Sequence, residues 1–277
     1  GWADMFRGMR GVYTVLLNVG IGVHAIDIFV ITTVMPAVVA EIGGVEFYAW
    51  TTMLYMVGTV MGAASGQYAR ALFGRRKGYV AAGLIFLAGA LGCAAAPNMA
   101  SLLIFRTIEG IGGGLLMSQS MTLVNDFYTG KLRTRVLATI TTTWSIAAVV
   151  GPIIGGIWGN IGLWRGAFLT SSVLTVLFVL AAWKVVPESE RVQRQRLPYR
   201  RLLLLGTSVV LVGASGQFAD IAARGALIAA GILCLFVTLR LDRVEDNLFP
   251  RRVLSLFAPV GTAYWVFLLL SAAYTPM

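Results

Sequence analysis

Blocks of apolar residues, each close to 20 residues long, constrain this chain more than any other feature of its sequence. A helix needs about 20 residues to cross a hydrocarbon core of about 30 Å. A spanning segment must be helical, because lipid offers the backbone no hydrogen-bond partners. We therefore predict nine spans, at residues 13–37, 48–69, 78–96, 101–124, 136–158, 166–186, 202–218, 225–239 and 254–275.

Composition supports an all-α polytopic membrane protein. Charged residues make up 12% of the chain and hydrophobic residues 58%, with a mean hydropathy of +0.81. A soluble domain has about 25% charged residues and could not hide this much apolar surface. The first span is too long and too polar for a cleaved signal peptide, so we expect it to remain as a helix.

The basic residues predict how the spans are oriented. Of the 22 Lys and Arg residues, 19 fall in connections on one side of the predicted membrane; Arg165 and Arg224 fall on the other side, and Arg106 lies inside a span. The positive-inside rule then places the N-terminus in the cytoplasm. We expect the protein to lie in the plasma membrane, which in a bacterium is the inner membrane. The basic residues behind the net charge of +10 lie in short loops between spans and do not form a nucleic-acid-binding face. We therefore expect no nucleic acid partner.

Residues for metal or covalent chemistry are scarce. Cys93 and Cys234 are far apart in apolar spans, and the chain has a single His, so neither a disulfide nor a metal site is predicted. We expect no cofactor, and no enzyme, because no nucleophile, metal or paired-carboxylate arrangement is visible. The glycine cluster at Gly110, Gly112, Gly113 and Gly114 follows no strand, and close helix packing explains it better than a nucleotide loop.

Three ionisable residues, Asp27, Arg106 and Glu109, lie inside predicted spans. Inserting each of them into a membrane costs about 2.5–3.5 kcal/mol of free energy. Because such residues are rare in spans unless they have a role, each is a candidate functional residue. The first span runs outward and the fourth inward, which places Asp27 about 15 Å and the other two about 8–12 Å from the outer end. A carboxylate and a guanidinium at similar depth can pair and lower the cost of both.

Two interpretations of these charges remain open. Arg106 and Glu109 are three residues apart on one helix face, so a local ion pair is the simpler one. That pair would leave Asp27 uncompensated, and we hypothesise instead that Asp27 exchanges a proton during transport. His24, one turn before Asp27, either relays a proton or is an ordinary packing residue.

Several short motifs resemble the major facilitator superfamily, and within it the proton-coupled drug antiporters. The segment from Asp27 to Pro36 is similar to the family's first-helix signature, and Trp50 and Tyr55 stand five apart as in its second helix. Arg106-Thr-Ile-Glu109-Gly110 looks like the family motif whose arginine takes part in proton transfer. The usual Gln is Glu109 here, which adds a second titratable group.

A further resemblance implies roles in gating and helix packing. Gly151-Pro152-Ile-Ile-Gly155-Gly156 resembles the antiporter motif of the fifth helix, in which small residues allow close approach and the proline bends the helix. The loop from Gly66 through Gly74, Arg75 and Arg76 resembles the family's glycine and arginine loop. Its acidic residue is missing, so the gate salt bridge that this residue forms in the family is in doubt.

The resemblance also implies a domain organisation. We expect an N-terminal six-helix transmembrane bundle at 1–190, a basic loop with two linker helices at 191–246, and the first helix of an incomplete C-terminal bundle at 247–277. This is the order of the fourteen-helix branch, and a twelve-helix transporter cut after its ninth span is the alternative. Either way we expect the sequence to be part of a longer protein.

The leading functional hypothesis is a monomeric, proton-coupled antiporter that exports lipophilic or cationic small molecules across the bilayer by alternating access. Side chains expected to contact the substrate are Trp50, Tyr55, Met117 and Trp144, although helix packing is the simpler explanation for any one of them. The alternatives are proton-coupled transport of a specific metabolite, sugar or lipid, or a non-transporting membrane subunit with the same fold.

Overall fold

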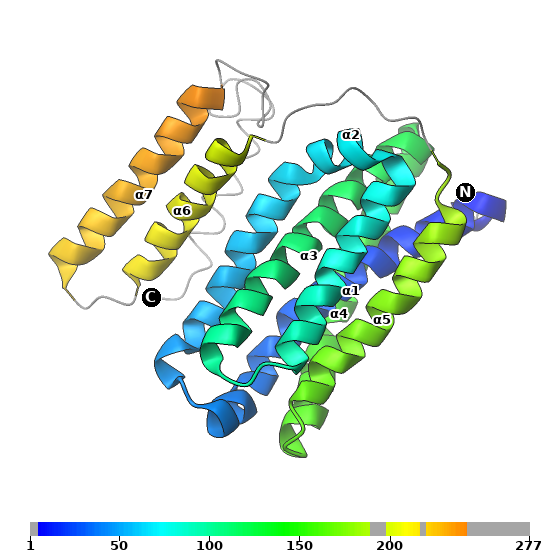
Figure 1. Ribbon diagram of the computed structural model, residues 1–277. Coiled ribbons are helices and arrows are strands. Elements are labelled where there is room, and N and C mark those ends of the chain that lie inside the picture. Colours follow the sequence, from blue (N-terminus) through cyan, green and yellow to red (C-terminus); the bar gives the residue numbers. More distant parts are fainter. Residues whose placement is uncertain (1–4, 189–197, 217–219, 243–277) are drawn as a thin grey trace. The chain divides into compact units, whose positions relative to one another are not determined.

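The computed structural model describes residues 5–188, 198–216 and 220–242, and those residues form helices and connections without strands. The elements are α1 (Gly8–Ile42), η2 (Val45–Phe47), α2 (Tyr48–Ala94), α3 (Met99–Phe127), α4 (Gly130–Asn160), α5 (Arg165–Val185), α6 (Tyr199–Ser215) and α7 (Ile221–Asp242) (Figure 1). The chain divides into two compact units, Gly1–Leu202 and Leu203–Met277. The domain boundaries expected from the sequence stay a prediction.

Six of the described helical segments are long and apolar enough to cross a membrane. They contain the first six predicted spans and the eighth, and they make the chain a multi-pass membrane protein. The seventh predicted span corresponds to α6, which has 17 residues. The ninth, at 254–275, lies outside the described residues.

Helix α2 corrects one expectation, because the predicted loop between the second and third spans is helical. Its 47 residues would extend about 70 Å if straight, more than twice the hydrocarbon core. The chain instead reverses at Gly74, whose φ of 78° and ψ of −179° only glycine adopts easily. Figure 1 shows the two legs of α2 running in opposite directions, with α3 between them. Gly66 therefore belongs to a helix and not to a loop.

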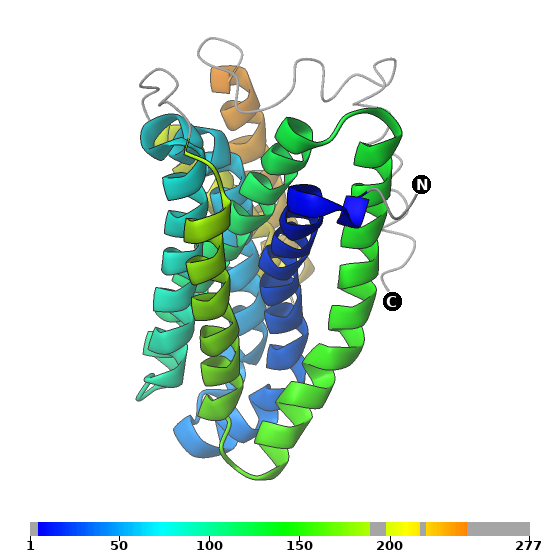
Figure 2. The same ribbon diagram turned by 90° about the vertical axis from the view of Figure 1, so that its right-hand side faces the viewer.

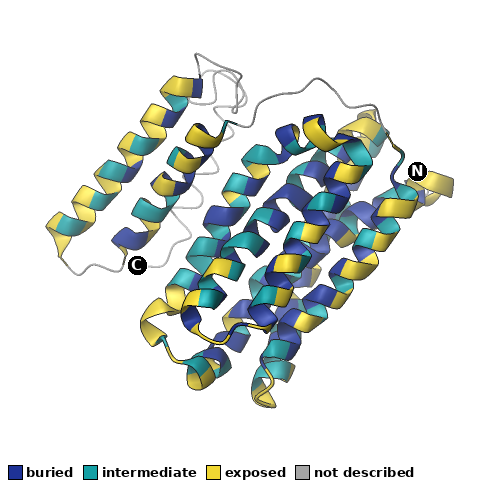
Figure 3. Ribbon diagram, in the orientation of Figure 1, coloured by how far each residue is buried: buried dark blue, intermediate teal, exposed yellow. Residues whose placement is uncertain are grey.

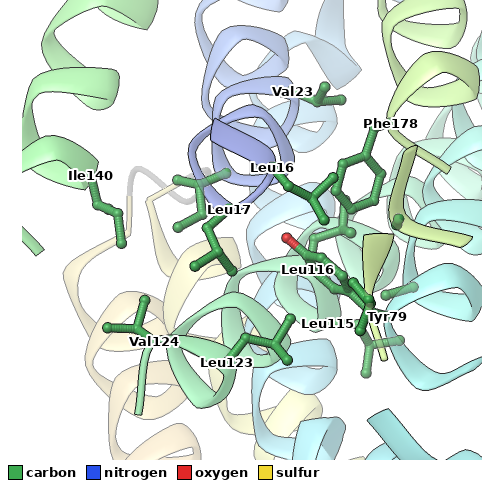
Figure 4. Close-up of a cluster of buried hydrophobic side chains, with 14 of the residues drawn as sticks. Leu16, Leu17, Val23, Tyr79, Leu115, Leu116, Leu123, Val124, Ile140 and Phe178 are labelled. Atoms are coloured by element: carbon green, nitrogen blue, oxygen red, sulfur yellow. The ribbon is translucent and has the colours of Figure 1, made fainter. Parts of the chain in front are cut away.

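Apolar side chains from all five helices fill the core of the first unit. Leu16 of α1, Tyr79 of α2, Leu116 of α3 and Phe178 of α5 are buried together, with Ile140 of α4 at the same level (Figure 4). Tyr79 and Phe178 meet edge to face, with ring centroids 4.9 Å apart. A second cluster of buried apolar residues, from α1, α2, α3 and α5, continues the core toward the other end of the helices.

Glycines bring α2 and α3 into backbone contact. A methyl group on Gly58 or Gly62 of α2 would lie 2.3 Å or 2.1 Å from a carbonyl oxygen of α3. A methyl group on Gly110 or Gly114 of α3 would lie 2.2 Å or 2.0 Å from a carbonyl oxygen of α2. Small residues four apart on both helices thus permit the close approach, and the packing interpretation of the glycine cluster is confirmed.

The motif on α4 packs against α1, with one exception. Methyl groups on Gly151 and Gly155 would lie 2.5 Å from Phe29 Cβ and 2.0 Å from Thr33 Oγ1, whereas one on Gly156 meets no described atom within 4 Å. Gly156 faces away from α1, and its expected role in gating or helix packing stays a prediction. Helix α4 continues through Pro152, and Figure 2 shows its C-terminal half slanting away from its N-terminal half.

The outward faces of the helices are apolar rather than polar. Figure 3 shows exposed residues along one side of the outer helices. On α4 these include Ile146, Val149, Ile153 and Ile157, which share one face at helical spacing and are each more than half exposed. Water would solvate such a stripe poorly, and a hydrocarbon environment suits it.

Neighbouring glycines of α4 provide a matched test of this packing. Gly155→Ala places a methyl group against α1 and should lower the free energy of unfolding by about 1–3 kcal/mol, as overpacking does. Gly156→Ala meets open space and should leave stability unchanged or raised by up to about 1 kcal/mol through helix propensity. Thermal unfolding of the purified protein in detergent measures both, and equal effects would contradict the described contact.

Candidate functional site

A buried charge cluster joins α1 to α3. The Arg106 guanidinium donates from Nη1 to Asp27 Oδ2 at 2.6 Å and to Glu109 Oε2 at 2.8 Å. All three side chains are at most 1% exposed. The local pair and the pair between helices, which the sequence left as alternatives, are thus both present and share one nitrogen atom.

Close helix contacts hold this cluster away from solvent. Glu109 is pressed against the returning leg of α2, where a methyl group on Gly89 would lie 2.4 Å from its Cα. Gly110, the next residue of α3, touches the backbone of the first leg of α2. Because α3 is clamped between the two legs, its charged face turns toward Asp27 on α1. Small residues therefore decide where the charges lie.

Several polar atoms of the cluster have no hydrogen-bond partner among the described residues. They are Nε and Nη2 of Arg106 and Oε1 of Glu109. The guanidinium carbon of Arg106 lies 4.0 Å from the centre of the Tyr55 ring, and a cation over an aromatic face is stabilised electrostatically. The Cys93 thiol donates to Glu109 Oε2 at 3.6 Å. The cluster is thus rich in charge and poor in hydrogen bonds, which favours a change of protonation or partner.

His24 contacts the cluster through Tyr55. Its Nδ1 lies 2.8 Å from the Tyr55 hydroxyl, and the two rings stack with centroids 5.7 Å apart. Trp144 of α4 meets the imidazole edge-on at 6.0 Å, and a methyl group on Gly113 would lie 2.2 Å from Nδ1. The imidazole therefore hydrogen-bonds the Tyr55 hydroxyl, and a role of His24 in proton relay stays a prediction.

Two contacts of the carboxyls could not be found from the sequence. Ser171 of α5 donates from its hydroxyl to Asp27 Oδ1 at 3.5 Å, and Cys93 of α2 reaches Glu109. Both are small polar residues within apolar spans, where nothing in the sequence separates them from ordinary packing residues. They show that four helices surround the cluster.

The four side chains expected to contact substrate lie in different places. Tyr55 and Trp144 belong to the surroundings of His24. Trp50 of α2 and Met117 of α3 are half-buried, and their contact with substrate stays a prediction. Within the described residues, no three His, Cys, Asp or Glu side chains are arranged to hold a metal ion.

At one end of the unit, acidic residues from α3 and beyond α5 pair with the basic residues around Gly74. Asp126 Oδ2 lies 2.5 Å from Arg70 Nη2 and 3.2 Å from Arg75 Nε. Glu188 pairs with Arg76 at 2.9 Å and with Lys77 at 3.7 Å. The carboxylate that the loop motif lacks is therefore supplied by α3, from a position that the loop sequence alone does not reveal.

The opposite end is joined by Glu41, the second last residue of α1. It accepts a hydrogen bond from Trp164 Nε1 at 2.8 Å and forms an ion pair with Arg165. Arg165 also donates to the carbonyl oxygen of Ala96 at 3.1 Å. Trp164 and Arg165 thus tie the start of α5 to the end of α1 and to the connection that follows α2.

Comparison with known proteins identifies the family. The model of the Major Facilitator Superfamily matches residues 17–276. The chain belongs to the major facilitator superfamily. It is 31% identical over 279 residues to a probable multidrug-efflux transporter of Mycobacterium tuberculosis, and this match covers 98% of the chain and 58% of that protein. It is 35% identical over 159 residues to the multidrug transporter protein MdtP of Bacillus subtilis, covering 56% of the chain and 29% of MdtP.

Solved structures share the fold. The inward-open xylose transporter XylE from E. coli aligns with a TM-score of 0.57 at 18% identity, over 98% of this chain and 76% of XylE. A second structure of XylE, bound to a bromo-deoxyglucose, gives a TM-score of 0.58 over 91% of the chain. At this identity the likeness concerns the helical arrangement and not the substrate. The chain spans little more than half the length of the M. tuberculosis relatives.

Removing Arg106 tests how far the cluster depends on it. Arg106→Leu leaves two buried carboxyls without their cation and should cost about 3–5 kcal/mol of unfolding free energy. Asp27→Asn leaves Arg106 paired with Glu109 and should cost about 1 kcal/mol, the value of one hydrogen bond. Thermal unfolding in detergent compares the two variants, and equal losses would contradict a shared guanidinium.

Proposed function

We propose that this chain forms the proton-coupling half of an antiporter that exports lipophilic or cationic small molecules by alternating access. The observation that carries the proposal is the single guanidinium nitrogen of Arg106 shared by Asp27 and Glu109 in a desolvated site. An ionisable group inside the membrane that is bound to a competing partner suits a proton pathway. Family membership and the efflux relatives support export as the direction.

The charge count of the cluster suggests how it works. Two ionised carboxylates and one guanidinium leave one net negative charge in a site that is at most 1% exposed. An uncompensated buried charge costs several kcal/mol, so the closed site is more stable when the two carboxyls hold one proton between them. Opening toward water lifts this constraint and lets the proton leave. Proton release and conformational change are coupled in this way.

His24 and Tyr55 connect the cluster to the neighbouring helices. The Tyr55 hydroxyl bonds His24, while the Tyr55 ring lies against Arg106. A change in the position of Arg106 therefore moves a ring that touches His24, which in turn touches Trp144 on α4. We propose that this chain of contacts carries the protonation state of the carboxyls toward the substrate. His24 then positions Tyr55 and need not itself exchange the proton.

Alternating access in this fold rocks helical bundles about a site near the middle of the membrane. Gly151 and Gly155 on α4, with Gly66 and Gly110 at the α2 and α3 contact, pack the helices of this unit closely together, so the unit moves as one body. We propose a monomer in the plasma membrane, with the N-terminus and the Arg70 to Asp126 ion pair on the cytoplasmic side. The excess of Lys and Arg in the connections on that side supports this orientation.

Asp27→Asn tests the coupling directly. The amide keeps the size of the side chain but cannot exchange a proton, so export driven by a pH gradient should fall by about a hundredfold or more. Uptake of ethidium into proteoliposomes that contain the full-length protein, after a pH jump, measures this. Passive counterflow of ethidium at equal pH is the control, and full gradient-driven transport in Asp27→Asn would overturn the proposal.

Glu109→Gln tests the retained proton. Without the Glu109 carboxyl, the ionised Asp27 and Arg106 form a neutral pair that needs no proton. The infrared carbonyl band of a protonated carboxyl at pH 7 should therefore disappear from the resting protein. The number of protons exchanged per substrate molecule should fall as well. If neither Glu109→Gln nor Asp27→Asn changes that band, the two carboxyls do not share a proton in the closed site.

A further inference from the structure

The two carboxyls of the buried charge cluster differ in how many of their oxygen atoms have a hydrogen-bond donor. Asp27 accepts on both oxygens, from Arg106 Nη1 on Oδ2 at 2.6 Å and from the Ser171 hydroxyl on Oδ1 at 3.5 Å. Glu109 accepts two bonds on Oε2, from Arg106 Nη1 at 2.8 Å and from the Cys93 thiol at 3.6 Å. No described group donates to Glu109 Oε1, which is buried. The two acidic side chains are therefore not equivalent.

This difference affects the free energy of ionising each carboxyl. An ionised carboxyl carries its charge on both oxygens, so a dry site stabilises it well only where both oxygens have donors. Asp27 meets this condition and Glu109 does not. A charged oxygen that is buried without a donor costs more free energy than a neutral one. The retained proton of the closed site is therefore more stable on Glu109 than on Asp27.

The other groups around Glu109 do not supply the missing donor. The neighbouring thiol already donates to Oε2, the Tyr55 hydroxyl lies against His24, and Nε and Nη2 of Arg106 reach no acceptor among the described residues. The carboxyl of Asp27 lies within hydrogen-bonding distance of Glu109, but it can only accept while it is ionised. A proton on Glu109 neutralises the oxygen that lacks a donor and gives Asp27 a further hydrogen bond.

We propose that Glu109 holds the retained proton and that Ser171 is the positioning residue that keeps Asp27 ionised. This inference rests on the proposed function, because it names the carboxyl that holds the proton of the cluster. Asp27 then serves as the fixed negative charge that makes Glu109 retain the proton. When the site opens to water, the O–H bond of Glu109 breaks, the proton passes to a water molecule, and the electron pair stays on the carboxylate. Ser171 acts on this step through Asp27.

Isotope-edited infrared spectroscopy of the full-length protein at pH 7 tests the assignment. The side-chain carboxyl carbon of either the glutamates or the aspartates is labelled with the heavy carbon isotope, which lowers the frequency of the carbonyl band of a protonated carboxyl. The band of the cluster is the one that is present in the native protein and missing in Glu109→Gln. We expect this band to shift in the glutamate-labelled protein and to stay in place in the aspartate-labelled protein.

The other outcomes of the labelling contradict the assignment. A shift of the band with the aspartate label alone, or equal shifts with both labels, would overturn this inference and leave the shared proton of the proposed function in place. If Glu109→Gln removes no band, the closed site retains no proton, and both the inference and the proposed function are overturned. The two failures are thus distinguishable in one experiment.

Two adjacent buried serines of α5 supply matched variants. Ser171→Ala removes the donor to Asp27 Oδ1, so the preference of the proton for Glu109 should fall by about tenfold and part of the band should shift with the aspartate label. Ser172→Ala removes a hydroxyl that donates to the Phe168 carbonyl of the same helix, and should leave the label pattern unchanged. Melting temperatures in detergent show that both variants fold. Equal label patterns in the two variants would overturn the role of Ser171.

Discussion

The position of Arg106 governs the arrangement of the first helical unit. A guanidinium that cannot reach water must be paired, and its carboxylate partners come from its own helix and from α1. This need for pairing fixes the position of Asp27 along α1 relative to Arg106 on α3. It also brings α1, which begins at Gly8, against α3, which begins at Met99. The rest of the packing preserves this contact.

Glycines make that contact possible. Gly58 and Gly62 on α2 and Gly110 on α3 allow backbones to touch, and Gly89 brings the returning leg of α2 against Glu109. Such contacts leave no space for water, and an ion pair in a dry site is more strongly coupled than one in water. The same small residues therefore stabilise the bundle and make the charges of the cluster depend on one another.

The ion pairs at the ends of the helices differ from the buried charge cluster in the middle. There the ion pairs are partly exposed, as between Arg75 and Asp126 or Glu41 and Arg165, and each pair contributes little stability by itself. Such pairs separate and re-form at low cost. The buried cluster in the middle therefore holds its helices together more firmly than the weak pairs at either end.

The sequence by itself determined the first six membrane spans, the family and the residues that cannot be left unpaired, because long apolar blocks and charges within them have few physical solutions. It also indicated that Asp27 and Arg106 lie at similar depth. Only the tertiary structure decided that Arg106 serves both carboxyls and that His24 bonds Tyr55, since these depend on which helix faces meet. Helix faces in lipid are set by small residues such as Gly110, and their pairing is not visible along the chain.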